Sequence, residues 1–259
     1  MTRTRTRLAG ILAGALFSMA LVTGPVLASS ATLTSEPAST AAGTLLPCAE
    51  DWIKARTDPS IPNVRAAGDC EVDRRLDTLT RLKAAVAAAD HMTPEHQAAL
   101  TSILDASTTG LTALRAQIDA DTTLGELRTD VHRIYTDFRI YALVARQVHL
   151  VRADDLAAAI ANRLDTIGGT IQDAIDAAKG AGKDVTEAQQ HLDAMRADVA
   201  AARSAVSGDA AAILALTPSQ WNGGTAEPVL KSARTSVADA RNDLRDAAAA
   251  ARAAVRALK

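Results

Sequence analysis

The sequence predicts an all-α protein: an elongated antiparallel helical bundle or coiled coil, in which two three-helix sub-bundles share one long central helix. Two observations support this fold class. Of the 259 residues, 58 are alanine and only six are aromatic. Alanine is the best helix former, whereas β-branched and aromatic residues dominate strands. In addition, apolar residues recur at steps of three and four along most of the chain after residue 70, which is the spacing of one helix face.

The apolar spacing divides this part of the chain into five helices, which short turns would make antiparallel. They are expected at about 71–91, 94–118, 124–179, 185–216 and 230–258. Two of the helix starts carry capping signals. Thr93 precedes a proline at the first helical position, and Thr123 and Glu126 have the spacing of a capping box. Thr217–Thr225 is expected to be a loop.

The long third helix contains a change of apolar register. Its first seam ends at Val148, and a second seam, one residue out of phase, begins at Ile160. Continuing the first seam would place Arg152 and Asp155 in the core, where unpaired charges are unfavourable. We therefore expect the seam to break at Arg152–Asp155.

This change of register suggests two bundles joined by the third helix. The N-terminal bundle would cover residues 48–151 and the C-terminal bundle residues 152–259. A continuous third helix would be about 80 Å long at a rise of about 1.5 Å per residue. A kink at Ala153–Asp155 or at Gly168-Gly169 is the alternative.

The first 28 residues have the pattern of a secretory signal peptide. Arg3, Arg5 and Arg7 precede the apolar run Leu8–Val22, and Val26-Leu27-Ala28 provides a cleavage site. An uncleaved membrane anchor is the alternative, but this run is shorter than the roughly 20 residues that span a bilayer. The mature protein is therefore expected to be secreted or to stay in the cell envelope.

Residues 29–47, rich in serine, threonine, alanine and proline, are expected to form a flexible linker. The only two cysteines, Cys48 and Cys70, follow it. An even pair in an exported chain predicts a disulfide, which would stabilise the fold by about 3 kcal/mol. The alternative, a free catalytic thiol, requires both cysteines to stay reduced outside the cell. Asp58-Pro59 and Ile61-Pro62 predict turns within this short arm.

Three aromatic residues, Tyr135, Phe138 and Tyr141, lie within seven positions of the third helix. Phe138 and Tyr141 are on the apolar seam, so the simplest interpretation is a bulky core layer. Tyr135 lies off the seam and would join Arg139 and His132 in a surface recognition patch, because aromatic and arginine side chains are common interface anchors.

Two further features are candidate interaction sites. Trp221, in the expected loop, is interpreted as an anchor over a bundle end, with ligand contact as the alternative. In the last helix, one side of the seam carries Lys231, Arg234, Arg241, Arg245, Arg252, Arg256 and Lys259. The simplest interpretation is that they pair with the acidic region Asp154–Asp176 and with the fourth helix. The functional alternative is contact with anionic envelope polymers or lipid headgroups, which salt would weaken.

Sequence motifs for catalysis are absent. The chain has no Gly-x-Ser-x-Gly, Ser-x-x-Lys or His-Glu-x-x-His pattern and no phosphate-binding glycine loop. His91 and His96 flank a turn, but a metal site needs three or four convergent ligands. We therefore expect no enzymatic activity, no cofactor and no metal site. A net charge of −2 argues against a nucleic-acid partner.

Three parts of the sequence together resemble a family of secreted, alanine-rich helical proteins of actinobacteria. These are Leu111–Leu114 with Ile118–Thr122, Asp137–Tyr141 with Leu150-Val151, and Leu216–Asn222 before the last helix. The resemblance covers roughly Arg74 to Lys259. It implies an exported helical fold and transfers no site, since the family has no assigned activity.

The leading functional hypothesis is an exported, non-enzymatic structural spacer, scaffold or interaction protein at the cell envelope. The alternative is a soluble binding module that recognises an anionic envelope polymer or a membrane surface through its arginine-rich helix faces. The expected partner is thus a protein or an anionic component of the envelope.

Overall fold

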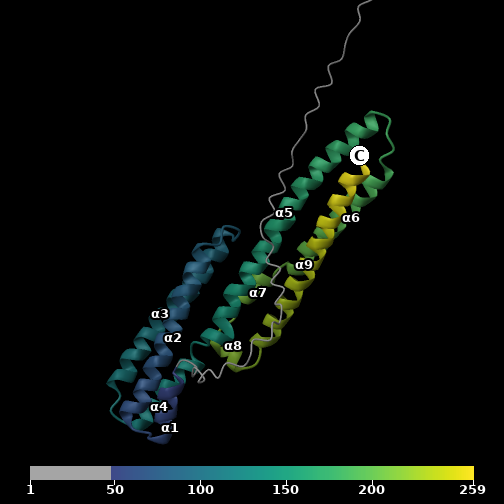
Figure 1. Cartoon of the computed structure of the whole chain (residues 1–259). Helices are drawn as coiled ribbons and strands as arrows, with labels where there is room; N and C mark the ends of the chain where they lie inside the picture. Colours follow the sequence, from purple (N-terminus) through teal and green to yellow (C-terminus); the bar gives the residue numbers. More distant parts are fainter. Residues whose placement is uncertain (1–47) are drawn as a thin grey trace, which may run out of the picture. The chain divides into compact units, whose positions relative to one another are not determined.

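The computed structural model describes residues 48–259, which form an all-α helical bundle, as predicted (Figure 1). The helices are α1 (Ala49–Thr57), α2 (Ile61–Ala87), α3 (Pro94–Ala120), α4 (Leu124–Thr136), the π-helix η1 (Ile140–Val144), α5 (Ala145–Gly180), α6 (Thr186–Val206), α7 (Asp209–Leu214), α8 (Pro218–Asn222) and α9 (Ala226–Ala257). Residues 48–259 contain no strand, and none of their helices is both long enough and apolar enough to cross a membrane. The predicted signal peptide (1–28) and linker (29–47) lie outside the described residues.

The arm closed by the two cysteines is helical. The sulfur atoms of Cys48 and Cys70 are 2.03 Å apart, so the predicted disulfide ties the start of α1 to α2. α2 begins at Ile61, well before the expected start near Glu71. Pro62 falls in its first turn, where a backbone N–H is not needed, so this proline starts a helix instead of forming the expected turn.

α3 and α4 begin where their capping signals predict. The Thr93 hydroxyl accepts a hydrogen bond from the backbone N–H of His96 at 3.2 Å. The Thr123 hydroxyl accepts one from the backbone N–H of Glu126 at 3.3 Å. Each bond satisfies an N–H group that has no partner within the first turn of its helix.

The predicted long central helix is interrupted. α4 ends at Thr136, and α5 starts only after η1, so the third helix is not continuous from Leu124 to Lys179. Arg139, with a left-handed φ of 47°, precedes the π-helix. Neither expected kink position is where the break occurs, because α5 runs through both Ala153–Asp155 and Gly168-Gly169.

A close contact with α3 lies at this break. Gly110 on α3 lies against the ring of Phe138, and a Cβ atom at Gly110 would be only 2.5 Å from Phe138 Cε1. Phe138 can pack against the surrounding core because position 110 has no side chain. The break therefore coincides with a close contact to α3, a partner that the local sequence of α4 does not contain.

The predicted fourth helix is also divided. α6 ends at Val206, and Gly208, with a left-handed φ of 85°, connects it to α7. Glycine tolerates the left-handed conformation at position 208 without steric strain. The expected loop Thr217–Thr225 contains the short helix α8, which Thr217 and Gln220 cap reciprocally.

Two hydrophobic clusters form the interior of the bundle. The first contains residues of α1 to α4, η1 and α7, with the beginnings of α5 and α9; the second contains later residues of α5 and α9 together with α6. α5, α6 and α9 lie side by side (Figure 1). Along α9 the contact residues Ala240, Ala247 and Ala254 are fully buried. Such small contact residues let helices pack at short interaxial distances.

Candidate interaction surfaces

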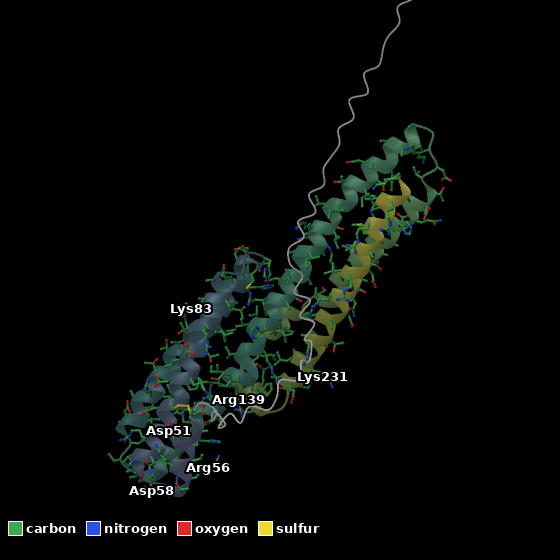
Figure 2. All side chains as sticks on the ribbon, viewed as in Figure 1. Asp51, Arg56, Asp58, Lys83, Arg139 and Lys231 are labelled. Carbon is green, nitrogen blue, oxygen red and sulfur yellow. A yellow bond between two sulfur atoms is a disulfide. The ribbon has the colours of Figure 1, made fainter. Side chains whose placement is uncertain are left out.

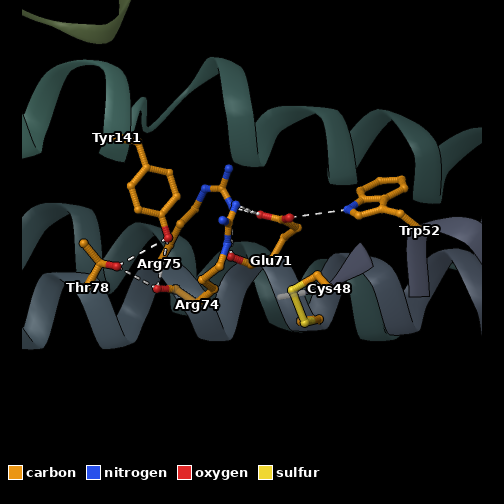
Figure 3. A network of polar contacts seen from close by, with 8 residues as sticks. Cys48, Trp52, Glu71, Arg74, Arg75, Thr78 and Tyr141 are labelled. Atoms are coloured by element: carbon orange, nitrogen blue, oxygen red, sulfur yellow. Dashed lines mark hydrogen bonds and ion pairs between the residues drawn. A yellow bond between two sulfur atoms is a disulfide. The ribbon is translucent and has the colours of Figure 1, made fainter. Parts of the chain in front are cut away.

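A buried ion pair lies on α2 (Figure 3). Glu71 and Arg75 are only 5% and 4% exposed and are paired one turn apart. The Glu71 carboxylate also accepts hydrogen bonds from Arg74 Nη2 at 2.7 Å and from Trp52 Nε1 at 3.4 Å. Burial alone would raise the pKa of Glu71, but the hydrogen bonds from Arg75 and Arg74 outweigh burial and lower it. An ionised Glu71 therefore links α1 to α2.

The aromatic residues of the predicted core layer and recognition patch lie beside this ion pair. The Arg75 guanidinium carbon is 4.6 Å from the centroid of the Tyr135 ring and 5.2 Å from that of Tyr141. Tyr141 is 39% exposed, and its hydroxyl donates to the carbonyl of Arg74 at 3.2 Å, so its assignment to a core layer is wrong. Tyr135 is half-buried, and its ring covers the Arg75 cation.

Two of the predicted interaction residues, Arg139 and Trp221, contribute to the contacts of α8 beside the helix break. Arg139 Nε donates to Asn222 Oδ1 at 2.6 Å, and Asn222 Nδ2 donates to the carbonyl of Thr136 at 2.9 Å. The guanidinium carbon of Arg146 lies 5.3 Å from the centroid of the Trp221 ring. α8 is thus fastened across the end of α4 and the start of α5. These contacts support the interpretation of Trp221 as an anchor.

Asp155 lies in the core, although the change of register was expected to keep it out. It is 4% exposed, its Oδ1 is 2.8 Å from His96 Nδ1, and its Oδ2 accepts a hydrogen bond from the Thr93 N–H at 3.2 Å. Partners at the start of α3 therefore satisfy the buried carboxylate. The expectation that Asp155 stays out of the core assumed an unpaired charge, and this charge is paired.

The neighbouring Asp154 has no such compensation. It is 7% exposed, and its Oδ1 has no hydrogen-bond partner among the described residues. Burial, and then the charges of Asp209 and Asp155, raise its pKa to about 6, while His96 acts in the opposite direction. Asp154 is therefore a buried group that changes charge near neutral pH.

The two histidines that flank the turn before α3 do not converge on a common point of coordination. His96 bonds to Asp155, whereas His91 Nε2 lies 3.1 Å from the carbonyl oxygen of Arg152. Within residues 48–259, no group of three or more histidine, cysteine, aspartate or glutamate side chains is placed to hold a metal ion.

One face of α9 carries a row of exposed cations, which we call the α9 basic face. It consists of Lys231, Arg234, Arg241, Arg245, Arg252 and Arg256 together with Lys259 just beyond the end of the helix. All seven are exposed, and Lys231 is labelled in Figure 2. Its five arginines follow one another at steps of seven, four, seven and four residues. Such steps are close to two turns and one turn of a helix, so the arginines align.

The α9 basic face does not pair as the simplest interpretation required. Among the described residues, none of its seven members forms an ion pair. Asp165, in the acidic region of α5 that was expected to pair with α9, pairs with Arg203 of α6 instead. The acids of α9 lie on another side. Burial, followed by the charges of Asp246 and Asp243, raises the pKa of Asp198 on α6. α9 therefore directs its acids toward α6 and leaves its arginines to solvent.

A hollow of about 460 Å³ lies between α1 and α4. Its walls include Trp52 and Tyr135, and Arg56 and Arg128 lie at its surface. This site could not be predicted from the sequence, because the arm that contains α1 was not expected to be helical. The available signal was the four-residue spacing of Trp52 and Arg56, which places both on one helix face.

No protein-family model, curated protein or solved structure matches this chain in the three comparisons made.

Proposed function

We propose that this chain is an exported, non-enzymatic interaction protein that binds an anionic polymer of the cell envelope along the α9 basic face. Export is supported by the signal-peptide pattern and is compatible with the Cys48–Cys70 disulfide, because disulfides persist mainly outside the cytoplasm. The absence of catalytic sequence motifs supports a non-enzymatic role.

The observation that carries this proposal is the row of aligned and unpaired arginines. A surface arginine opposite a carboxylate would already be neutralised, whereas those of the α9 basic face have no ion-pair partner among the described residues. From Arg234 to Arg256 the row extends about 33 Å at a rise of about 1.5 Å per residue. A linear polyanion lying along α9 would meet all five guanidinium groups.

A polymer fits this face better than a membrane surface does. A helix that binds in the membrane interface buries its apolar face among lipids. The apolar face of α9 is occupied, because its seam residues are buried within the bundle: Leu230, Ala233, Val237, Ala240, Leu244, Ala247, Ala251 and Ala254. Among the described residues of α9, Val255 is the one large apolar side chain that is substantially exposed, at 36%. The α9 basic face therefore presents positive charge, but α9 has no broad apolar surface left that could insert into a membrane.

The test compares two variants of the purified protein that have the same net charge. The first replaces Arg241, Arg245, Arg252 and Arg256 by glutamine. The matched control replaces four exposed cations of α5, α6 and their connection by glutamine: Arg163, Lys179, Lys183 and Arg196. Binding of long-chain polyphosphate is measured by isothermal titration, and phosphatidylglycerol vesicles serve as the membrane probe.

We expect the α9 variant to bind polyphosphate roughly 30-fold more weakly than the wild type, since each exposed contact is worth about 0.5 kcal/mol. The control variant should lose less than a factor of about three. Equal losses in the two variants would show that only net charge matters and would contradict the proposal. Tighter binding to vesicles than to polyphosphate would identify the membrane surface as the target instead.

The second candidate function is that of a spacer or scaffold. It is favoured by α5, whose 36 residues contribute to both hydrophobic clusters and so join them rigidly. A pure spacer needs no ligand, so it would bind polyphosphate no more tightly than the α9 variant does.

A further inference from the structure

The hollow between α1 and α4 combines aromatic walls with unpaired cations. Trp52 and Tyr135 supply two half-buried rings, and Ala55, Val64 and Val131 form a buried apolar floor. Its volume of about 460 Å³ lies within the range of roughly 300–1,000 Å³ that is typical of sites for small molecules. The hollow is therefore large enough for a ring system.

The charged residues that line this hollow are all basic. Arg56 and Arg128 line it, together with His132, and no carboxylate is among its lining residues. Arg56 and Arg128 are exposed and form no ion pair among the described residues. The nearest acid of the same turn of α4, Asp130, is already paired with Arg133 at 3.1 Å. Figure 2 labels Arg56 on α1.

The two rings are held in place before any ligand arrives. The Trp52 indole donates to Glu71, and the Tyr135 ring is fixed against Arg75. The disulfide additionally ties the start of α1 to α2. Walls fixed in this way lose little conformational entropy when a ligand binds, which favours affinity.

We propose that this hollow binds a small organic anion with a flat apolar part, such as an aryl carboxylate or aryl sulfonate. The ring of the ligand would lie against Trp52 and Tyr135, and its anionic group would interact with Arg56 and Arg128. Arginine suits this role because it stacks on rings and forms bidentate hydrogen bonds with carboxylates and similar anions. This site is separate from the α9 basic face, and its test does not depend on the proposed function.

Fluorescence offers a direct test, because the chain has only two tryptophans, Trp52 and Trp221. In the Trp221→Phe background, Trp52 is the only tryptophan that can report binding. The probes are 1-anilinonaphthalene-8-sulfonate, which is aromatic and anionic, and the neutral N-phenyl-1-naphthylamine. Both are titrated against the background protein, a double variant with Arg56→Gln and Arg128→Gln, and a control with Arg163→Gln and Arg196→Gln.

We expect saturable quenching of Trp52 by the anionic probe. The double variant should bind this probe about fivefold more weakly, while its affinity for the neutral probe changes by less than about twofold. The control should bind both probes like the background protein. Lack of quenching at millimolar anionic probe would overturn the proposal. An equal loss of affinity for both probes in the double variant would also overturn it, because the arginines would then not interact with the anionic group.

Discussion

Replacing Asp154 by asparagine should stabilise the protein at pH 8 and leave its stability at pH 4 nearly unchanged. The side chain is buried on α5, and one of its oxygens has no hydrogen-bond partner among the described residues. Burial, then the charges of Asp209 and Asp155, raise the Asp154 pKa from its ordinary value of 3.8 to about 6, against the opposing effect of His96.

The direction of the effect follows from the two pKa values. Because the folded state has the higher pKa, it favours protonated Asp154, and this contribution is complete below the ordinary pKa of 3.8. The contribution is lost as the pH rises through about 6. Each pKa unit corresponds to about 1.4 kcal/mol, so the wild type loses at most about 3 kcal/mol from this residue between pH 4 and pH 8.

An asparagine at position 154 has nearly the same shape and stays neutral throughout. Urea unfolding followed by far-ultraviolet circular dichroism at pH 4, 6 and 8 would measure the difference in free energy of unfolding between variant and wild type. We expect the advantage of the variant to grow from near zero at pH 4 to about 2–3 kcal/mol at pH 8. A difference that is independent of pH, or a variant less stable at pH 8, would refute the reasoning.

The matched control is Asp155→Asn on the next residue of α5. The Asp155 carboxylate accepts a hydrogen bond from the Thr93 N–H and bonds to the ring of His96, so it is compensated where Asp154 is not. Its replacement should destabilise the protein at pH 7 by about 1–3 kcal/mol, since buried partners would lose their charged acceptor. Changes of opposite sign in the free energy of unfolding at these two adjacent buried aspartates would show that hydrogen-bond partners, and not burial alone, decide whether the carboxylate stabilises the fold.

Two further predictions concern packing and the disulfide. Gly110→Ala should lower the free energy of unfolding by about 1–3 kcal/mol, because the new Cβ would lie 2.5 Å from Phe138 Cε1. Gly169→Ala within α5, where a Cβ meets no atom within 4 Å, should instead raise it by about 0.5–1 kcal/mol; the same sign for both substitutions would contradict this account of the helix break. Reduction of Cys48–Cys70 should lower the free energy of unfolding by about 3 kcal/mol, as measured by urea unfolding with and without reductant. An unchanged urea midpoint in reductant would show that α1 is held by its other contacts alone.

The sequence predicts those parts of the fold that depend on local signals. The starts of α3 and α4 follow from their threonine caps. In α9, the alternating steps of three and four identify residues that are buried, from Leu230 through Ala254. Such signals act within a few residues, so one chain segment suffices to detect them.

Features that depend on distant partners could not be predicted in this way. The apolar seam continues from Ile134 through Phe138, so nothing local signals the break that Gly110 on another helix permits. Burial of Asp155 likewise depends on Thr93 and His96, which lie about 60 positions earlier in the chain.

The candidate sites also combine features that the local sequence predicts with features that depend on distant partners. Alignment of the α9 arginines is a local property and was predicted, whereas the absence of ion-pair partners required knowledge of where α5 and α6 direct their acids. Arg139 bonds to Asn222, the neighbour of Trp221 in α8, whereas Tyr135 covers Arg75. The role of Trp52 could not be predicted, because it depends on the packing of α1 against α2 and α4.

The measurement that tests the proposed function most directly is retention of the protein on envelopes isolated from the organism that encodes it, as a function of salt. The wild type and the control variant, which keeps the α9 basic face, should be retained at low salt. Both should be released as the ionic strength rises well above about 0.15 M, where the Debye length falls below about 8 Å. The variant that lacks Arg241, Arg245, Arg252 and Arg256 should not be retained. Equal retention of all three proteins, or retention that is insensitive to salt, would contradict binding through the α9 basic face.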